Sequence, residues 1–244
     1  MRHGSALFMH GEPTEMAFTV FRYMFSKKSI RWGNLRRLTP VSNLFGFDRG
    51  TPIDRYYINE FLEASHADIQ GRVLEVGGNE YTHKYGDRRV EMSDVLHATA
   101  ENPQATIVGD LATGKGIPKN VFDCMIVTQT FPCIYEMRGA IASCYESLKT
   151  GGIVLVTLPG ISQISRYDMD RWGDYWRFTT LSAARLFEEA FGTGNVTVKA
   201  YGNVLAASSF LYGLASEELT KEELDYHDPN YQLLITVRAV KSES

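Results

Sequence analysis

The stretch RVLEVGG (72–78) is a short apolar run that ends at two glycines. Six further apolar runs follow it, at 90–96, 105–111, 122–129, 152–160, 195–201 and 231–240. Strands that alternate with helices, and whose residues are almost continuously apolar, are typical of parallel sheets buried on both faces. The sequence therefore predicts an α/β fold with a Rossmann-like, seven-stranded, mostly parallel sheet and helices on both faces.

Helical segments lie before and between these runs. Apolar residues recur at helical spacing in 14–30, 53–65, 137–148 and 181–191. In the polar segment 215–230, Thr220 and Glu223 have the spacing of a capping box at the start of a further helix. The segment 31–52 is irregular and rich in Gly and Pro. We expect a helical and loop extension at 1–52, which we interpret as a lid, and one α/β domain at 53–244.

The composition favours a cytoplasmic protein that neither spans a membrane nor binds nucleic acid. The 244 residues carry a net charge of −4, so the surface as a whole has no attraction for phosphate backbones. No apolar run approaches the roughly 18 residues of a membrane span. The three cysteines lack CxxC spacing, which fits a reducing compartment better than disulfides or zinc.

Basic residues gather near the amino terminus, where residues 1–50 hold eight Lys and Arg against three acidic residues. The stretch 27–37 has three open interpretations. It is a solvated face, a contact for the phosphate of a nucleotide- or lipid-linked saccharide, or a contact for an anionic membrane surface. The last two interactions would weaken as salt is added.

Glycines and polar residues lie where each predicted strand passes to the next helix. They are Glu75, Gly77 and Gly78 at the end of the first run, Asp94 at the end of the second, Asp110 with Leu111 at the end of the third, and Thr128 with Gln129 at the end of the fourth. The carboxyl ends of parallel strands meet at one sheet edge, where open α/β sheets bind ligands. An acid at the second strand end can accept both ribose hydroxyls, and one at the third can accept the adenine amine.

Each of these residues also has a plainer interpretation. Gly77 and Gly78 suit an ordinary tight turn, and Asp94 or Asp110 taken singly suits a helix N-cap. The stretch VGGNEYTHKYG lacks the GxGxxG pattern, which disfavours a dinucleotide reductase. The nucleoside interpretation therefore depends on the carboxylates of Glu75, Asp94 and Asp110 converging on one hollow.

In this order, VLEVGG, SDVLH, VGDL, FDCMIVTQT and LKTGGIVLVTLPG resemble the sequential motifs of class I S-adenosylmethionine-dependent methyltransferases, over about 69–159. The resemblance implies that 53–244 is a methyltransferase-like domain with S-adenosylmethionine as cofactor. It assigns Glu75, Gly77 and Gly78 to the methionine part, Asp94 to the ribose, Asp110–Leu111 to the adenine, and Thr128–Gln129 to the neighbourhood of the sulfonium. The family's first motif usually contains GxGxG, whereas this chain has GGNE at 77–80, so a non-binding member stays an alternative.

Two longer stretches, FGFDRGTPIDRYYI (45–58) and SRYDMDRWGDYWRFT (165–179), resemble methyltransferase-like proteins and domains associated with bacterial glycan assembly. This resemblance implies a sugar or a glycan-pathway intermediate as acceptor. The candidates for a lid over the cofactor carboxylate are Arg49, Arg55 and the cofactor-binding candidates Tyr56 and Tyr57. Alternatively, the two tyrosines pack against neighbouring helices.

Methyl transfer to a hydroxyl group needs a base, because an alcohol barely ionises at neutral pH. The segment 165–179 leaves the fifth run at the same sheet edge. Asp168 and Asp174 are the first candidates for the base, followed by His97 and His227. The candidates for acceptor binding are Arg166, Tyr167, Trp172, Tyr175, Trp176 and Arg177, because aromatic faces with interleaved charges suit a sugar ring. Alternatively, 175–178 fills the core and the acids pair with the arginines.

The pattern DMD (168–170) offers two carboxylates without a third ligand in view, so we predict no metal site. The resulting hypothesis is an O-methyltransferase for a saccharide or saccharide-containing intermediate. The alternatives are a methyltransferase for another small molecule, through oxygen or nitrogen, and a cofactor-binding module without turnover in glycan assembly. The oligomeric state stays open.

Overall fold

The computed structural model describes residues 33–242 and divides the chain into two compact units, Met1–Leu38 and Thr39–Ser244. The predicted helix 14–30 and most of the basic stretch 27–37 lie outside the described residues. The described part of the first unit contains a single turn of 3-10 helix, η1 (Gly33–Leu35). The second unit begins at Thr39, earlier than the predicted domain boundary at Ile53.

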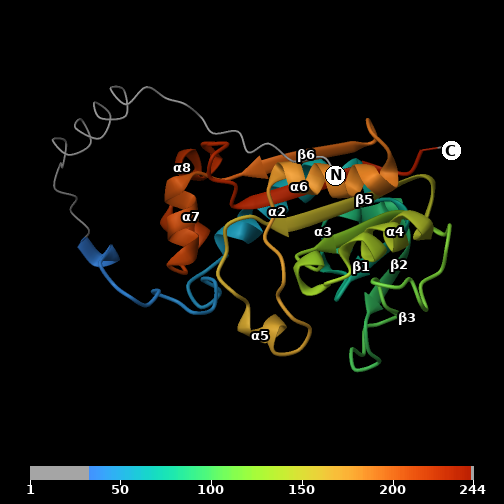
Figure 1. Cartoon of the computed structure of the whole chain (residues 1–244), viewed down its shortest axis with the longest axis horizontal. Coiled ribbons are helices and arrows are strands. Elements are labelled where there is room, and N and C mark those ends of the chain that lie inside the picture. Colours follow the sequence, from blue (N-terminus) through green and yellow to red (C-terminus); the bar gives the residue numbers. More distant parts are fainter. Residues whose placement is uncertain (1–32, 243–244) are drawn as a thin grey trace, which may run out of the picture. The chain divides into compact units, whose positions relative to one another are not determined.

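The second unit is built on a seven-stranded sheet with the order β3-β2-β1-β4-β5-β7-β6 (Figure 1). Its strands are β1 (Gly71–Val76), β2 (Val90–His97), β3 (Ile107–Val108), β4 (Phe122–Thr128), β5 (Leu148–Pro159), β6 (Val196–Tyr201) and β7 (Leu234–Val240). All neighbouring pairs from β3 to β5 are parallel, and β7 runs antiparallel to β5 and β6. The predicted seven-stranded, mostly parallel sheet is confirmed.

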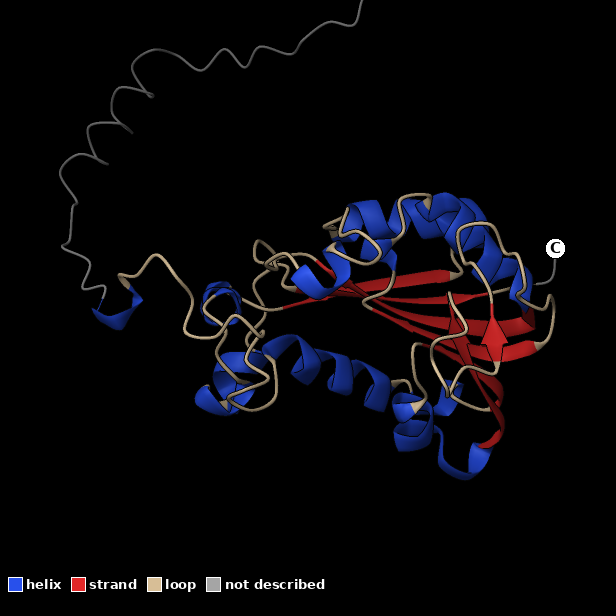
Figure 2. Cartoon of the chain, turned by 90° about the horizontal axis from the view of Figure 1, so that it is seen from below, coloured by secondary structure: helices blue, strands red, loops and turns tan. Residues whose placement is uncertain are grey.

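Helices cover both faces of the sheet (Figure 2). They are α2 (Ile53–Ala64), α3 (Glu80–Gly86), α4 (Met137–Ser147), α5 (Arg166–Met169), α6 (Thr180–Phe191), α7 (Val204–Leu211) and α8 (Lys221–Asp225). Single 3-10 turns are η2 (His66–Asp68), η3 (Asp87–Arg89), η4 (Phe131–Cys133) and η5 (Ser216–Glu218).

The core consists of two apolar clusters, one on each face of the sheet. Met125 and Val127 of β4 pack in the cluster that contains α4 and α6. The alternating residues Cys124 and Ile126 pack in the cluster that contains α2 and α7. Successive strand residues point to opposite faces, so a strand buried on both sides must be apolar throughout. This explains why the runs read as continuously hydrophobic.

Residues 39–52 belong to the second unit, where they pack against the segment that follows α7. The backbone N–H of Val41 donates to the carbonyl of Tyr212 at 2.7 Å, and Pro52 forms an antiparallel bridge with Ala215. Arg49 pairs with Glu218. This segment therefore forms one wall beside the start of α2 and does not belong to the amino-terminal extension.

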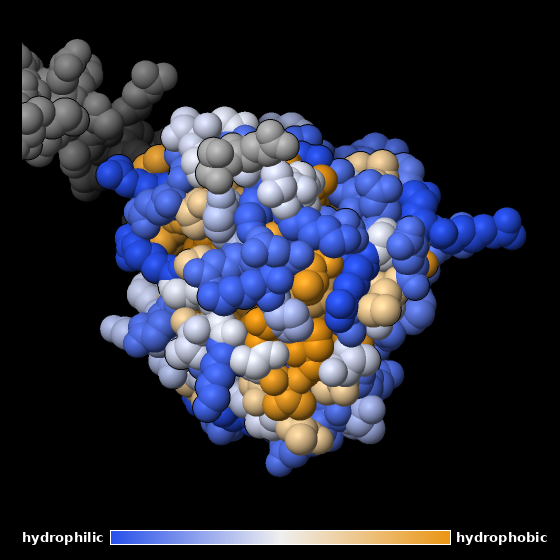
Figure 3. Space-filling view, turned by 90° about the vertical axis from the view of Figure 1, so that its right-hand side faces the viewer, coloured by the Kyte–Doolittle hydropathy of each residue, from blue (hydrophilic) through white to orange (hydrophobic). Residues whose placement is uncertain are grey.

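The face shown in Figure 3 is mainly hydrophilic and contains a hydrophobic area among hydrophilic residues. Among residues 33–242, no helix has the length and apolar character needed to cross a membrane.

Candidate functional site

The end of β1 is held by a buried carboxylate. Glu75 is 3% exposed and accepts hydrogen bonds from the backbone N–H of Thr82 at 2.8 Å, from its hydroxyl at 2.7 Å and from the N–H of Tyr81 at 3.3 Å. Burial raises the pKa of Glu75, and the hydrogen bonds from Thr82 and Tyr81 oppose that rise. Glu75 therefore ties β1 to the first turn of α3.

The turn between β1 and α3 leaves open space beside Gly77. This residue has φ 89°, and a Cβ built on it would meet nothing within 4 Å. Gly78 differs, because the side chain of Glu80 lies against it and a Cβ there would be 2.1 Å from Oε2. Only Gly77 of the predicted pair thus offers backbone to a ligand without moving a neighbouring side chain.

The position predicted for Asp94 is wrong. β2 continues three residues further, to His97, so Asp94 lies inside the strand. Its Oδ2 is 2.7 Å from Nε of Arg72, and its Oδ1 accepts from the hydroxyl of Thr106 at 2.7 Å. Asp94 is 7% exposed and connects the start of β1 with the residue before β3. Each of its two carboxylate oxygens has a partner within the protein.

His97 stands at the end of β2 in place of the expected acid. Its Nδ1 lies 3.2 Å from the backbone N–H of Thr99, which can donate to it. The ring of Trp172 packs against it edge to face, with centroids 5.9 Å apart. This arrangement brings the loop after β5 to the end of β2. The structure thus places an imidazole and an indole at this strand end.

The residues after β3 form a compact turn. Asp110 accepts from the backbone N–H of Ala112 and from the hydroxyl of Thr113, each at 2.8 Å, and its side chain is exposed. Leu111 is 5% exposed and belongs to the core cluster under α4. The carboxylates of Glu75, Asp94 and Asp110 therefore each accept hydrogen bonds from within the protein, and none of them lines the cavity described below.

The end of β4 carries an unusual backbone conformation. Gln129 has φ 50°, a region that residues other than glycine rarely adopt. Its backbone N–H donates to the carbonyl of Thr157 at 3.0 Å. The conformation turns the chain away from Thr128 and places Gln129 on the wall of a cavity. Strained residues of this kind concentrate at functional sites.

That cavity, with a volume of about 450 Å³, lies at the carboxyl ends of β4 and β5. Its walls are residues 43–47, the first turn of α2, the segment after β4, and the loop 162–177. The size falls within the range of small-molecule sites, roughly 300–1,000 Å³. Of the predicted residues, the cavity brings together Gln129, Arg166, Tyr167, Asp168, Asp174 and Arg177.

One wall residue, Asp54, was not singled out as a site residue from the sequence. Its Oδ2 lies 3.1 Å from Nη1 of Arg55. Its Oδ1 is buried without a hydrogen-bond partner, and no other side-chain atom among residues 33–242 is in that situation. Burial raises the pKa of Asp54 more than the charge of Arg55 and the neighbouring backbone N–H groups lower it. Asp54 therefore has hydrogen-bonding capacity that the protein itself does not use.

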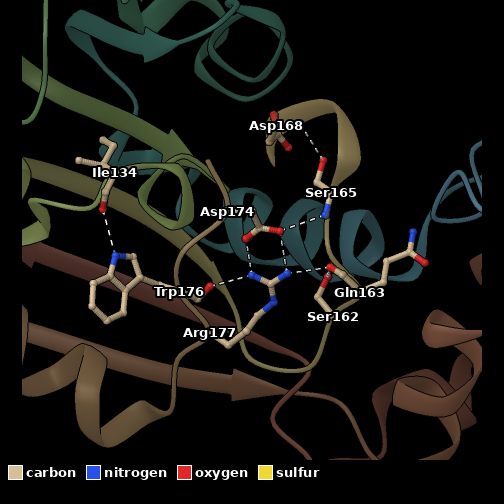
Figure 4. Close-up of polar contacts among 8 residues, drawn as sticks. All are labelled: Ile134, Ser162, Gln163, Ser165, Asp168, Asp174, Trp176 and Arg177. Atoms are coloured by element: carbon tan, nitrogen blue, oxygen red, sulfur yellow. Dashed lines mark hydrogen bonds and ion pairs between the residues drawn. The ribbon is translucent and has the colours of Figure 1, made fainter. Parts of the chain in front are cut away.

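Asp174 is a structural residue, which corrects its prediction as the base (Figure 4). Its carboxylate is 4% exposed and pairs with both Nη atoms of Arg177, at 2.5 and 2.9 Å. The backbone N–H of Ser165 donates to it at 3.0 Å. Burial raises the pKa of Asp174, but the bonds from Arg177 and Ser165 outweigh burial and lower it. The alternative in which an acid pairs with an arginine is confirmed for this pair.

Arg177 anchors the loop at more than one point. Besides Asp174, it donates to the backbone carbonyls of Gln163 and Trp176, each at 2.8 Å. Figure 4 shows the guanidinium between these groups. The loop 162–177 is therefore closed on itself through one buried ion pair.

Asp168 is the acid of this loop that both lines the cavity and has an unpaired carboxylate. Its backbone N–H donates to the hydroxyl of Ser165 at 3.3 Å, and its carbonyl accepts from Trp172 and Gly173. Within the part of the chain that the structure describes, its carboxylate has no hydrogen-bond or ion-pair partner. It lines the 450 Å³ cavity and so has the geometry expected of a proton acceptor.

The predicted aromatic residues do not form one surface. Tyr167 lines the cavity, and the guanidinium of Arg171 lies 3.7 Å from its ring centroid. Trp172 packs on His97. Tyr175 and Trp176 instead pack against Tyr135 and do not line the 450 Å³ cavity.

The lid predicted from Tyr56 and Tyr57 is wrong for both residues. The hydroxyl of Tyr56 donates to Asp225 of α8 at 2.7 Å. Tyr57 is 2% exposed, and its hydroxyl donates to the carbonyl of Leu224 at 2.8 Å. The alternative, that they pack against a helix, is confirmed. Arg55 is the member of that group that lines the cavity.

The described residues give little support to a thiol nucleophile or to a metal site here. Burial raises the pKa of the Cys133 thiol in the cavity wall to about 12, so it stays protonated at neutral pH and is a poor nucleophile. Residues 33–242 contain no cluster of three or more His, Cys, Asp or Glu side chains that is placed to hold a metal ion. His227 is exposed beyond the end of α8 and does not line the cavity.

The antiparallel last strand, β7, lies between β5 and β6. No protein-family model matches the sequence, and no curated protein matches it significantly. Among solved structures, a possible histamine N-methyltransferase of Thermotoga maritima has a TM-score of 0.51 at 14% identity, covering 80% of this chain and 95% of that chain.

The N-methyltransferase NodS of Bradyrhizobium japonicum, in complex with S-adenosylhomocysteine, has a TM-score of 0.50 at 13% identity and covers 84% of this chain and 95% of its own. Phosphoethanolamine N-methyltransferase 2 of Haemonchus contortus has a TM-score of 0.47 at 15% identity. It covers 71% of this chain, which spans only about half (49%) of that longer protein. At these identities, the two structures with TM-scores of 0.50 and 0.51 show that this chain has a methyltransferase-like fold, and they show the fold alone.

Proposed function

We propose that this protein is an S-adenosylmethionine-dependent methyltransferase that transfers a methyl group to a hydroxyl of a saccharide or a saccharide-containing intermediate. The observation that carries the proposal is the 450 Å³ cavity at the carboxyl ends of β4 and β5, into which the protein presents a free carboxylate, Asp168. In a fold of this type, that edge is where ligands bind.

The residues at the methionine end of such a cofactor suit it. The unpartnered Oδ1 of Asp54 has the charge to accept bonds from an ammonium group, and the adjacent Arg55 has the charge to hold a carboxylate. The open side of Gly77 allows close approach of the ligand to backbone. At the adenosine end, His97 at the end of β2 and Asp110 after β3 are proposed to contact the cofactor.

The bound cofactor supplies an activated methyl group on a sulfonium. The protein then has to orient the acceptor and take up its proton. Asp168 is the residue proposed to take the proton from the acceptor hydroxyl. Arg166 and Tyr167, which follow one another in the same loop, are proposed to bind the acceptor beside it.

Isothermal titration calorimetry with S-adenosylmethionine and S-adenosylhomocysteine tests the cofactor assignment. Binding of both in the micromolar range is the expected result. Detection of methylated product by mass spectrometry, with panels of sugar and non-sugar acceptors, tests the acceptor class. Transfer only to amines or to non-sugar alcohols would replace the saccharide with another small molecule.

A specific observation also favours a second candidate, a module in glycan assembly that has no catalytic turnover. The carboxylates of Glu75, Asp94 and Asp110 all serve bonds within the protein. A chain that has lost its nucleoside ligands would look like this. Absence of binding to both cofactor forms, in a protein shown to be folded by its unfolding transition, would favour this second candidate.

A further inference from the structure

A second cavity, with a volume of about 520 Å³, lies beside the first, between the start of α4 and the start of α6. Tyr135 and Trp176 form its aromatic side, and Arg138, Ser182 and Leu186 contribute to the remainder. Arg177 lines both cavities. The two spaces are therefore neighbours that share one wall residue.

The aromatic side belongs to a group of three rings that pack against one another and are partly exposed. Trp176 stacks on Tyr135 with ring centroids 5.8 Å apart and planes inclined by 30°, and Tyr175 meets Tyr135 edge to face at 5.4 Å. The rings of Tyr135, Tyr175 and Trp176 stay 62%, 51% and 37% exposed. Large exposed apolar groups that gather in one place mark binding sites more often than chance.

Hydrogen bonds to the backbone hold the Trp176 ring and the main chain of Tyr175 in place. The indole Nε1–H of Trp176 donates to the carbonyl of Ile134 at 3.1 Å (Figure 4). The backbone N–H of Tyr175 donates to the carbonyl of Pro132 at 2.8 Å. A ring held in this way loses little conformational entropy when a ligand covers it.

Polar groups surround the aromatic rings. The carboxylate of Glu136 is exposed, and Nε of Arg138 lies 2.7 Å from Glu189 with most of the arginine side chain in solvent. A sugar ring has apolar faces that suit aromatic rings and a rim of hydroxyls that suits acids, arginines and serines. The aromatic rings of this cavity suit the apolar faces of a sugar, and the polar groups around them suit its hydroxyls.

We propose that the second cavity is a subsite for a further sugar ring, so that the acceptor is a saccharide of at least two residues. The inference rests on the proposed function, because it takes the first cavity as the place of methyl transfer. One ring then occupies the first cavity next to Asp168. The next ring passes Arg177 and lies on Tyr135 and Trp176.

Calorimetric titration of the full chain, saturated with S-adenosylhomocysteine, tests this subsite. The probes are glucose, mannose and galactose, together with disaccharides and trisaccharides built from each. We expect at least one series in which the disaccharide binds about tenfold tighter than its monosaccharide, equivalent to about 1.4 kcal/mol. Trp176→Ala should remove that difference, and Tyr226→Ala, which alters an exposed aromatic residue outside both cavities, should retain it.

Tyr135→Ala provides a second, independent variant if Trp176→Ala does not fold. Binding that is independent of saccharide length overturns the subsite. Tight binding of uridine monophosphate that is lost in Trp176→Ala overturns it as well, because the aromatic rings would then bind a nucleotide and not a sugar. If S-adenosylhomocysteine binds and a monosaccharide is methylated without any effect of length, the subsite fails while the proposed function stands. If S-adenosylhomocysteine itself does not bind, the proposed function fails.

Discussion

Arg72 and Asp94 form an ion pair across the first two strands, with Nε 2.7 Å from Oδ2. The second carboxylate oxygen of Asp94 is taken by the hydroxyl of Thr106 at 2.7 Å. Since both oxygens have partners within the protein, the pair braces the sheet at a point below the ligand-binding edge. The end of β2 is occupied by His97 instead.

Asp94→Asn should therefore affect stability and spare the cofactor. The substitution breaks a charge-assisted bond to a largely buried group, and we expect a loss of about 2 kcal/mol in the free energy of unfolding. Affinity for S-adenosylhomocysteine should stay within about twofold of the original. His97→Ala should do the reverse, lowering that affinity by roughly tenfold, about 1.4 kcal/mol, with a small change in stability. Urea denaturation measures the free energy of unfolding, and calorimetry measures the affinity for S-adenosylhomocysteine. A tenfold loss of affinity in Asp94→Asn, without a loss in His97→Ala, would contradict the structural role of Asp94.

Asp54→Asn should stabilise the protein at neutral pH. Burial raises the pKa of Asp54 in the folded protein, so its contribution to stability is complete below the unfolded value of about 4 and is lost as pH rises through the raised folded value. The free energy of unfolding of the variant should exceed the original value at pH 7, and the two should approach each other near pH 4. Glu63→Gln, at an exposed position of the same helix, is the control and should show no such pH dependence.

The same substitution should weaken ligand binding. If Asp54 holds an ammonium group of the cofactor, Asp54→Asn loses a charge-assisted bond and the dissociation constant for S-adenosylhomocysteine should rise about tenfold or more. Calorimetry at pH 7 measures this change. A variant that is more stable and binds equally well would show that the unpartnered oxygen has no role with this ligand.

Asp168→Asn should lower kcat by about 10²–10⁴-fold if Asp168 removes the acceptor proton. The affinity for S-adenosylhomocysteine should change little, because the effect lies in the proton transfer. Asp170→Asn is the matched control, since Asp170 lies two residues away and is exposed. Equal rates in both variants would show that Asp168 is not the base. His97 would then be the next residue to substitute.

Asp174→Asn should destabilise the loop after β5. The pKa of Asp174 is lowered in the folded protein despite burial, by Arg177 and Ser165. Its stabilising contribution is therefore present above the unfolded value of about 4 and is lost as pH falls through the lowered folded value. We expect the variant to lose about 1–3 kcal/mol at pH 7, with a smaller difference below pH 3. Chemical denaturation at both pH values checks this, and a constant difference would rule out the ion pair as its source.

The fold was largely predictable because its strands are short, well separated and mainly apolar, with at most two charged residues in each. Thr220 and Glu223 likewise identified the start of α8, where both capping bonds are present. Helix α7 was not predicted, since its residues are nearly all small or apolar and show little amphipathic period. The antiparallel direction of β7 depends on tertiary pairing, which local pattern does not encode.

The site was predicted less well, and two residues show why. Asp94 was assigned to a strand end because the run VEMSDVL stops at a leucine, but β2 continues through His97 and the acid falls within the strand. Asp54 was not predicted as a site residue from the sequence. Its importance comes from its place in a cavity whose walls also include residues 43–47 and the loop 162–177. That loop lies more than a hundred residues from Asp54 in the sequence.

The antiparallel course of β7 also determines how the protein can be handled on a surface. Val240 pairs with Ile153, near the point where β5 begins its buried run, so the last strand finishes on the side of the sheet remote from the carboxyl ends of β4 and β5. A biotin group or an affinity peptide joined beyond this strand would project away from both cavities. Protein immobilised through that attachment would present its ligand-binding side to the solution.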